Sequence, residues 1–309
     1  MTTEHLTDSS LDRAVDELGC QVVGAKLPPL KQININGSEL TYIEQGKGEL
    51  VVFVHGALGD FRTWSRQLAQ LAPKYHGISY SRRYHHRHSS TKPAIEYTHR
   101  HHVEDLIVLI NALGRGPAHL VGHSYGATVA ALVTLERPDL VKTLILGEPS
   151  LFSVLSGPHD KVSLRLYQVA LDVVRRLFES GEERLAIPEY VNIALGKDVF
   201  HQLALEDLLV INQNAHTLGP MLRTYFEPTA LDDTSAQKIK TPTLIITGEF
   251  SPGIYKAINH KLHNCLPNSE TFILPGASHG LQMENPEDFR SAMFEFLSKN
   301  RMKLGDDSC

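Results

Sequence analysis

A continuous apolar run that ends in glycine, ELVVFVHG at residues 49–56, is the feature that most limits how this chain can fold. Such a run predicts a strand buried on both faces, as in a parallel sheet covered by helices. Similar short runs follow at residues 76–81, 118–123, 142–148, 241–248 and 270–276, and most of them are separated by helix-like stretches. This alternation predicts an α/β fold with a mostly parallel sheet.

Two segments depart from that alternation. Residues 31–45 alternate in polarity around Asn36-Gly37, which predicts a β-hairpin. Residues 151–238 contain several helical stretches and no convincing strand, so they predict an inserted helical cap. The expected plan is therefore an N-terminal appendage at residues 1–30, a core at residues 31–150 and 239–303, and a cap at residues 151–238.

Inside the predicted cap, the first helix has an apolar stripe that would face the core, formed by Leu166, Ala170, Val173, Val174 and Leu177. Pro188 is expected to open the second helix, because proline is favoured in a first turn. In the appendage, Leu11, Val15 and Leu18 share one side of a short predicted helix that Gly19 ends.

Composition excludes several classes of function. The chain has 309 residues, 42% of them apolar and 21% charged, with a formal charge of −5, which argues against binding to nucleic acid or to a membrane surface. Its three cysteines are too few and too scattered for a disulfide framework. The N-terminal stretch lacks the apolar core of a signal peptide, and no apolar run approaches the ~18 residues of a membrane span. A cytoplasmic location is expected.

The strongest chemical signal is GHSYG at residues 122–126, which follows a predicted strand and precedes a predicted helix. Glycines on both sides of Ser124 allow a tight, strained turn that exposes the serine hydroxyl. The positive end of the following helix then faces any negative charge that develops there. The pattern favours a nucleophilic serine over an ordinary helix-capping serine.

With this motif and HGALGDFRTW at residues 55–64, the chain resembles the α/β-hydrolase superfamily over residues 38–302. The resemblance implies that the backbone N–H groups of Ala57 and Tyr125 form an oxyanion hole. It also implies that His279, in PGASHG just before the last predicted helix, is the catalytic base. A serine hydroxyl needs such a base because it is a weak nucleophile at neutral pH.

The acid of the triad is the open question. In many family members it follows the strand equivalent to residues 241–248, but that position here is Ser251, which cannot stabilise an imidazolium as a carboxylate does. Glu148 ends the preceding strand, as the acid does in some haloalkane dehalogenases, and is the preferred candidate. Glu249 is the second candidate, and an acid elsewhere or none at all is the third.

The segment that often reads D-x-R-G-x-G-x-S in the family reads SRRYHHRHSS at residues 81–90. The surrounding region holds seven histidines: His76, His85, His86, His88, His99, His101 and His102. A metal site that uses His86 and His88 is conceivable, but no cysteine or recognised carboxylate motif accompanies them, so a polar, partly stacked loop near the site entrance is preferred and no metal is predicted.

Together these features predict a serine hydrolase that cleaves an ester, lactone, thioester or amide of a small, partly hydrophobic substrate and requires no cofactor. Carbon–carbon hydrolysis of a diketone is a further option. The relatives that open epoxides or remove halogens use aspartate at the elbow, so those reactions are not expected. The alternative from another class is a catalytically weak ligand-binding protein on the same scaffold, motivated by Ser251. Substrate identity and oligomeric state cannot be inferred from the sequence.

Overall fold

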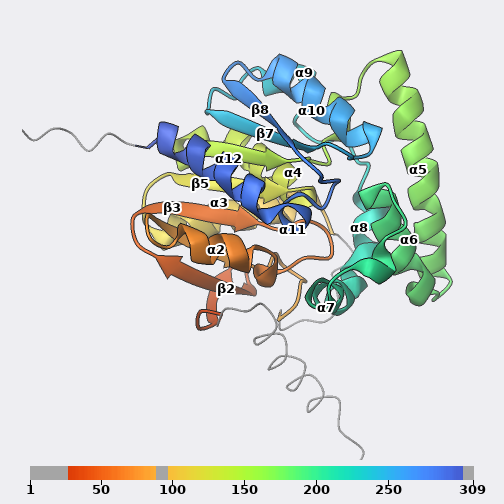
Figure 1. Cartoon of the computed structure of the whole chain (residues 1–309), viewed down its shortest axis with the longest axis horizontal. Helices are drawn as coiled ribbons and strands as arrows, with labels where there is room; N and C mark the ends of the chain where they lie inside the picture. The colour runs from red at the N-terminus through yellow and green to blue at the C-terminus, as the bar shows by residue number, and fades with distance from the viewer. Residues whose placement is uncertain (1–26, 88–96, 302–309) are drawn as a thin grey trace, which may run out of the picture.

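The computed structural model describes residues 27–87 and 97–301, and within these ranges the chain forms one eight-stranded sheet with the order β1-β2-β4-β3-β5-β6-β7-β8 (Figure 1). The first two pairs in that order are antiparallel and the others are parallel. The strands are β1 Lys31–Ile35, β2 Ser38–Gly46, β3 Glu49–Val54, β4 Tyr75–Tyr80, β5 Ala118–His123, β6 Val141–Gly147, β7 Thr243–Gly248 and β8 Ser269–Leu274. The predicted α/β fold with a mostly parallel sheet is confirmed.

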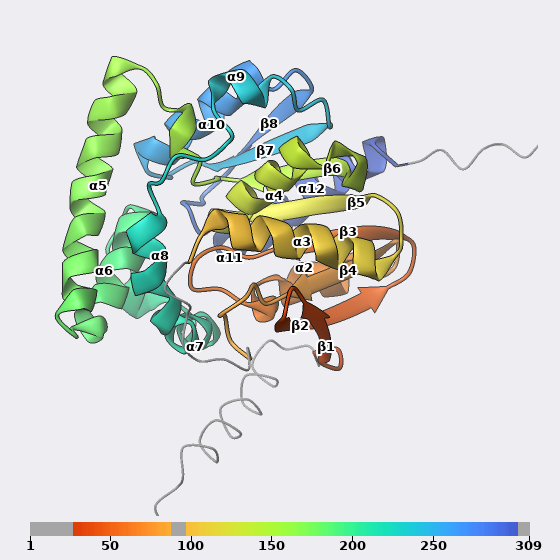
Figure 2. The same cartoon turned by 180° about the vertical axis from the view of Figure 1, so that it is seen from behind.

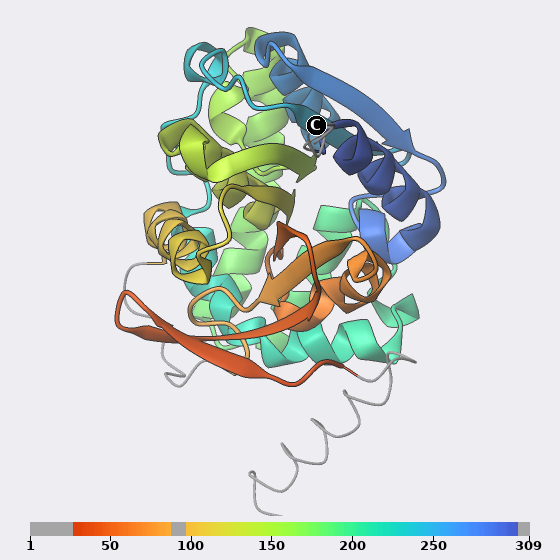
Figure 3. The same ribbon diagram turned by 90° about the vertical axis from the view of Figure 1, so that its left-hand side faces the viewer.

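The hairpin predicted around Asn36-Gly37 is also confirmed. Ile35 pairs with Ser38 across a two-residue turn in which both central residues have positive φ, as a turn between twisted antiparallel strands requires. The hairpin forms one edge of the sheet and β8 forms the other, as Figure 3 shows.

Helices cover both faces of the sheet. Figure 1 shows α2 and α12 on the near face, and Figure 2 shows α3, α4 and α10 on the far face. Their bounds are α2 Ser65–Leu71, α3 His99–Leu113, α4 Tyr125–Glu136, α10 Gly253–Cys265 and α12 Pro286–Lys299. Alternate residues of β3 enter the two apolar cores, Val52 on the α3 and α4 side and Phe53 on the α2 and α12 side. The central strands are therefore buried on both faces, which is why they read as continuous apolar runs.

Between β6 and β7 the described chain is helical and contains no strand, as the sequence predicted for residues 151–238. Its helices are α5 Pro158–Glu179, α6 Glu183–Leu195, α7 Leu205–Gln213, α8 Leu218–Thr224 and α9 Asp233–Ala236. The helices α5 to α8 stand beside the sheet rather than over either face, whereas α9 lies next to α10 (Figures 1 and 2). The exact domain limits stay a prediction, and the helix expected near residues 11–18 lies outside the described residues.

Two details of the helical segment differ from expectation. The predicted stripe of α5 is confirmed at Val174 and wrong at Leu166 and Val173, which are 68% and 49% exposed. With Val174 the helix buries Tyr167 and Leu171, which the predicted stripe did not include. A tyrosine can lie on the buried face here because its hydroxyl meets that of Tyr255 at 2.7 Å.

The second difference concerns the start of α6. The helix begins at Glu183, so Pro188 lies inside it rather than opening it. Gly181, with φ +81°, turns the chain so sharply after α5 that the new helix starts almost at once. Among the described helices, none is long and apolar enough to cross a bilayer.

Candidate active site

Ser124 occupies the sharp turn between β5 and α4, with φ 52° and ψ −120°. The two glycines of the motif are required because there is no room for a Cβ atom at either position. A Cβ added at Gly122 would lie 2.5 Å from the Cα of Ala127, and one added at Gly126 would lie 2.2 Å from the carbonyl oxygen of Val54. The strained conformation at Ser124 is held by this tight packing, which is typical of a nucleophile elbow.

His279 and Glu148 form a direct hydrogen bond. The Nδ1 atom of His279, in the loop after β8, lies 2.6 Å from Oε2 of Glu148, and both side chains are buried. The other carboxylate oxygen, Oε1, accepts a hydrogen bond of 2.8 Å from the backbone N–H of Gly248 at the end of β7. Because a carboxylate can only accept here, Nδ1 of His279 carries the proton and Nε2 is left as the proton acceptor.

Two further side chains hold the imidazole of His279. Tyr255 of α10 stacks on it, with ring centroids 3.8 Å apart and an angle of 9° between the planes. His123 donates through Nε2 to the carbonyl oxygen of His279 at 2.7 Å. The ring is therefore fixed by its carboxylate partner, by a stacked ring and through its own backbone.

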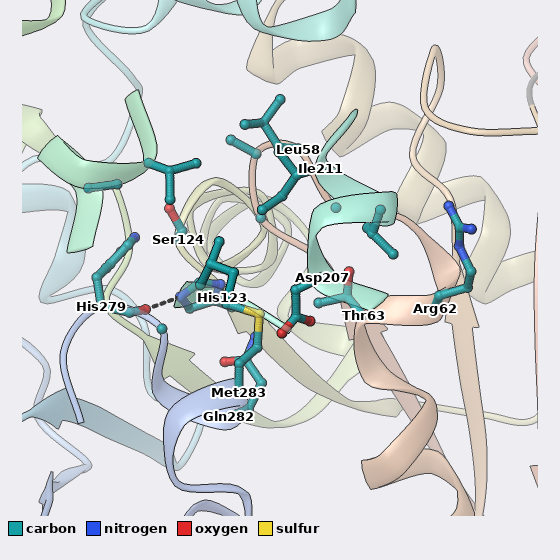
Figure 4. A pocket seen from close by; sticks show the side chains of 18 of the residues that line it. Leu58, Arg62, Thr63, His123, Ser124, Asp207, Ile211, His279, Gln282 and Met283 are labelled. Atoms are coloured by element: carbon teal, nitrogen blue, oxygen red, sulfur yellow. Dashed lines mark hydrogen bonds between the residues drawn. The ribbon is translucent and has the colours of Figure 1, made fainter. Parts of the chain in front are cut away.

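The hydroxyl of Ser124 is held more loosely. Within the described part of the chain its hydrogen-bond contact is the Ser150 hydroxyl, 3.5 Å away, and Ser150 in turn contacts the hydroxyl of Tyr225 at 2.7 Å. Ser124 and His279 both line the cavity, and Figure 4 shows them on the same side of it. Sequence reasoning missed Ser150, Tyr225 and Tyr255, because a buried hydroxyl near the elbow leaves no motif.

The other candidate acids do not contact His279. Glu249 is exposed, and its Oε2 accepts from the backbone N–H of Gly276 at 2.9 Å. Ser251 is buried, and its hydroxyl has no hydrogen-bond partner among the described residues. Of the two carboxylates named from the sequence, Glu148 and Glu249, the structure brings Glu148 to His279.

The backbone groups expected to form the oxyanion hole lie beside Ser124. A Cβ added at Gly56 would lie 3.3 Å from the Cβ of Ser124, so the loop that carries Ala57 passes directly against the serine. Ala57 lines the cavity. The ring of Tyr125 is buried between His99, stacked at 4.3 Å between centroids, and Tyr225, at 6.4 Å, so this residue offers the site its backbone.

The histidine-rich region was expected to form a polar loop near the entrance, and this expectation is wrong for His85, His99 and His102, which are buried. His55, His85, His99 and His102 are buried around the guanidinium of Arg82. Burial lowers the pKa of each of these four imidazoles below its usual range, to about 3 for His99. They are neutral residues that pack against one another and against the rings of Tyr97 and Tyr125.

The structure tests the conceivable metal site only in part. His88 lies outside the described residues, so the His86–His88 pair is not described as a unit. Within residues 27–87 and 97–301 no group of three or more histidine, cysteine, aspartate or glutamate side chains is arranged to hold a metal ion.

The cavity beside Ser124 is mainly apolar. Its wall is formed by the loop after β3, by α6 and α7, and by the segment around His279 (Figure 4). Asp207 and Gln282 interrupt the apolar wall. Burial raises the pKa of the Asp207 carboxyl, and the Gln282 amide is buried without a hydrogen-bond partner among the described residues.

A family model described as "alpha/beta hydrolase fold" matches residues 49–286. The chain belongs to this α/β-hydrolase family. It is 25% identical over 264 residues to the (E)-2-((N-methylformamido)methylene)succinate hydrolase of Acinetobacter baylyi, an alignment that covers 85% of this chain and 95% of the relative. An epoxide hydrolase of Caballeronia sordidicola is 41% identical over 139 residues, which is 41% of this chain and 42% of the relative.

Among solved structures, the enol-lactonase from Burkholderia xenovorans LB400 has a TM-score of 0.73 at 17% identity and covers 87% of this chain and 100% of its own. This likeness concerns the fold. The two sequence relatives are named as hydrolases of different substrates, so they support hydrolase activity for this α/β-hydrolase without indicating its substrate.

Proposed function

We propose that this α/β-hydrolase is a serine hydrolase that cleaves an ester, lactone, thioester or amide of a small, partly hydrophobic substrate through an acyl-enzyme. The observation that carries the proposal is the 2.6 Å hydrogen bond between His279 and Glu148, in a chain whose elbow residue is Ser124. It supplies the carboxylate whose apparent loss motivated the alternative of a ligand-binding protein with little turnover, so that alternative is not proposed.

In the acylation step, Nε2 of His279 takes the hydroxyl proton of Ser124 while the serine oxygen attacks the substrate carbonyl. The imidazolium that results is stabilised by the buried carboxylate of Glu148. Protonated His279 then gives its proton to the leaving group, and the acyl group stays on Ser124.

Charge on the carbonyl oxygen would be met by the N–H groups of Ala57 and Tyr125, which we assign as the oxyanion hole. Ala57 precedes the sharp turn at Leu58, whose φ is 55°, and Tyr125 is the first residue of α4. In deacylation His279 activates water, and the same two amides hold the second tetrahedral intermediate.

The character of the substrate follows from the cavity wall. Residues of α6 and α7 line the cavity, which supports the role of residues 151–238 as a cap: Tyr190, Val191, Ala194, Leu195, Leu209, Val210 and Ile211. Asp207 and Gln282 offer hydrogen bonds to a polar group on an otherwise apolar body. A small substrate with one such group fits this wall better than a fully apolar one.

The test is a pre-steady-state experiment with p-nitrophenyl butyrate, followed by acid quenching and mass spectrometry of the intact protein. The wild type is expected to release p-nitrophenol in a burst and to carry one butyryl group, which peptide mapping assigns to Ser124. Ser124→Ala is expected to lose the adduct and about 10⁵–10⁶-fold in kcat. An adduct that persists in Ser124→Ala, or equal hydrolysis by both proteins, would contradict the proposal.

A further inference from the structure

The guanidinium of Arg82 is a buried positive charge against which no carboxylate of residues 27–87 or 97–301 is placed. The residue follows β4 and is 1% exposed. Among the described residues no aspartate or glutamate forms an ion pair with it, and its acceptors are carbonyl oxygens, a tyrosine hydroxyl and an imidazole nitrogen. A buried unpaired charge is costly, so its retention calls for a function.

Two of the acceptors are consecutive carbonyl groups of the loop that runs past Ser124. Nε of Arg82 donates to the carbonyl oxygen of His55 at 3.2 Å, and Nη2 donates to that of Gly56 at 3.0 Å. On the other side Nη1 donates to the hydroxyl of Tyr97 at 2.8 Å and lies 3.2 Å from Nε2 of His102. These contacts fix the plane of the guanidinium, so its fork is aimed at the loop.

The carbonyl of Gly56 receives a second donor. The backbone N–H of Arg82 donates to Nε2 of His55 at 2.9 Å, so Nδ1 of His55 must carry the ring proton. That Nδ1–H donates to the carbonyl oxygen of Gly56 at 2.8 Å. Arg82 therefore holds this oxygen both directly and through the tautomer that it imposes on His55.

Fixing this oxygen also fixes the N–H of Ala57. In a planar trans peptide the C=O of one residue and the N–H of the next point in opposite directions. The Gly56 carbonyl points toward Arg82, so the Ala57 N–H points away from Arg82. Ser124 lies against the same stretch of backbone, since a Cβ added at Gly56 would lie 3.3 Å from the Cβ of Ser124. A charged donor on the carbonyl also polarises the peptide and strengthens its N–H as a donor.

The same guanidinium faces the second group of the hole. Its central carbon lies 4.6 Å from the centroid of the Tyr125 ring, whose backbone opens α4. One buried cation thus contacts both residues of the proposed hole from behind, through the carbonyl oxygen of the Gly56–Ala57 peptide and through the ring of Tyr125.

We infer that Arg82 is a positioning residue for the oxyanion hole, which aims the Ala57 N–H and keeps positive charge behind the site in a poorly solvated interior. The inference rests on the proposed function. It explains why this chain keeps an arginine surrounded by neutral histidines where the family often carries a glycine-rich loop.

The experiment compares Arg82→Met and Arg82→Lys with the wild type, using p-nitrophenyl butyrate. Arg82→Met is expected to lose about 10²-fold in kcat with KM changed less than about threefold, because the lost interaction acts on the transition state. Arg82→Lys keeps the charge but lacks the rigid planar fork that donates to both carbonyl groups from fixed positions, so it is expected to lose about tenfold. Arg83→Met, which removes the neighbouring ion pair with Asp105, is the matched control. It is expected to lower the melting temperature while kcat stays within about twofold.

A spectroscopic measurement separates positioning from a merely structural role. An alkyl trifluoromethyl ketone, labelled with ¹³C at its carbonyl carbon, forms a hemiketal with an activated serine, and its ¹³C shift reports ionisation of the hemiketal oxygen. In Arg82→Met this ionisation is expected about one to two pH units higher than in the wild type, corresponding to a 10–100-fold weaker hold on the oxyanion. Arg82→Lys is expected in between, and it serves as the test if Arg82→Met does not fold.

An unchanged hemiketal titration in a folded Arg82 variant would overturn the inference even if activity fell, because the loss would then lie elsewhere. A wild type that forms no hemiketal would overturn the proposed function together with the inference. The two failures are therefore distinguishable.

Discussion

The ends of two neighbouring strands, β6 and β7, differ in whether they present a carboxylate to His279. The β6 strand runs into Glu148, which is buried with both carboxylate oxygens hydrogen-bonded. The β7 strand runs into an exposed glutamate, Glu249, and then into Ser251, whose buried hydroxyl has no partner among the described residues. What remains at the β7 end is the backbone N–H of Gly248, which holds the carboxylate of the neighbouring strand.

The difference teaches that a triad acid is defined by its approach to the histidine rather than by its strand. Adjacent strands lie about 4.8 Å apart, so a longer side chain on one can reach the place served by a shorter one on the next. Glutamate has the extra methylene for that reach. Glu148 also adopts φ 47°, a conformation of cost about 1 kcal/mol or more for a residue with a Cβ, which its buried hydrogen bonds offset.

The largest effect is expected when the carboxylate of Glu148 is removed. Glu148→Gln keeps the shape of the side chain but no longer accepts with full charge, and its amide can impose the wrong tautomer on His279. We expect kcat for p-nitrophenyl butyrate to fall about 10⁴-fold. Thermal unfolding of the variant serves as the control for folding, and a folded variant with wild-type kcat would contradict the assignment.

A transfer of the acid between the strand ends is the second test. Glycine at position 148 accepts the positive φ, and an aspartate at position 251 projects beside Gly248, the residue that now binds Glu148. We expect kcat of Glu148→Gly/Ser251→Asp to be about 10–100-fold higher than that of Glu148→Gly alone. Failure to recover any activity in a folded double variant would mean that the β7 end cannot present an acid to His279 in this chain.

The stability of the protein is expected to depend on pH through buried histidines such as His99. Burial lowers the pKa of His99 to about 3, so the folded state stays neutral there while the unfolded chain takes up a proton below about pH 6.5. Stability from this residue is therefore complete above about pH 6.5 and is lost as the pH falls toward 3, by about 1.4 kcal/mol for each pH unit.

The variant that checks this is His99→Phe, which keeps the stacked ring against Tyr125 and removes the titration. Urea unfolding from pH 7 to pH 4.5 should show a free energy of unfolding that falls less steeply in the variant than in the wild type. Parallel curves would refute a neutral, buried His99.

The smallest effect is expected at the exposed end of β7. Glu249→Gln removes a carboxylate that bonds to the backbone of Gly276 and does not contact His279. We expect kcat to stay within about twofold of the wild type and stability to change by less than about 1 kcal/mol. A loss of kcat comparable to that of Glu148→Gln would contradict the assignment of Glu148, rather than Glu249, as the triad acid.

Much of the core could be predicted because its signals are local. The strands are buried on both faces and read as apolar runs, Asn36-Gly37 has the φ values of a hairpin turn, and the glycines around Ser124 are required by contacts of 2.5 Å or less. The placement of Glu148 near the end of β7 could also be predicted, because the carboxyl ends of parallel strands meet at one edge of the sheet.

The parts that were missed depend on contacts between distant segments. The buried face of α5 could not be chosen from aliphatic periodicity, because it includes Tyr167, whose hydroxyl finds its partner in Tyr255 of a helix far along the chain. The burial of the histidines likewise depends on Arg82, whose hydrogen-bond partners come from two distant segments, residues 55–56 and 97–102. Polar residues that satisfy one another in the interior look like surface residues in the sequence.

The most direct test of the central claim, that Glu148 is the acid that activates Ser124 through His279, is the second-order rate of labelling by a fluorescent fluorophosphonate. Wild type and Glu249→Gln are expected to label at equal rates, Ser124→Ala not to label, and Glu148→Gln to label at least about 10³-fold more slowly than the wild type. Labelling of Glu148→Gln at the wild-type rate, with loss of labelling in Glu249→Gln, would contradict the claim.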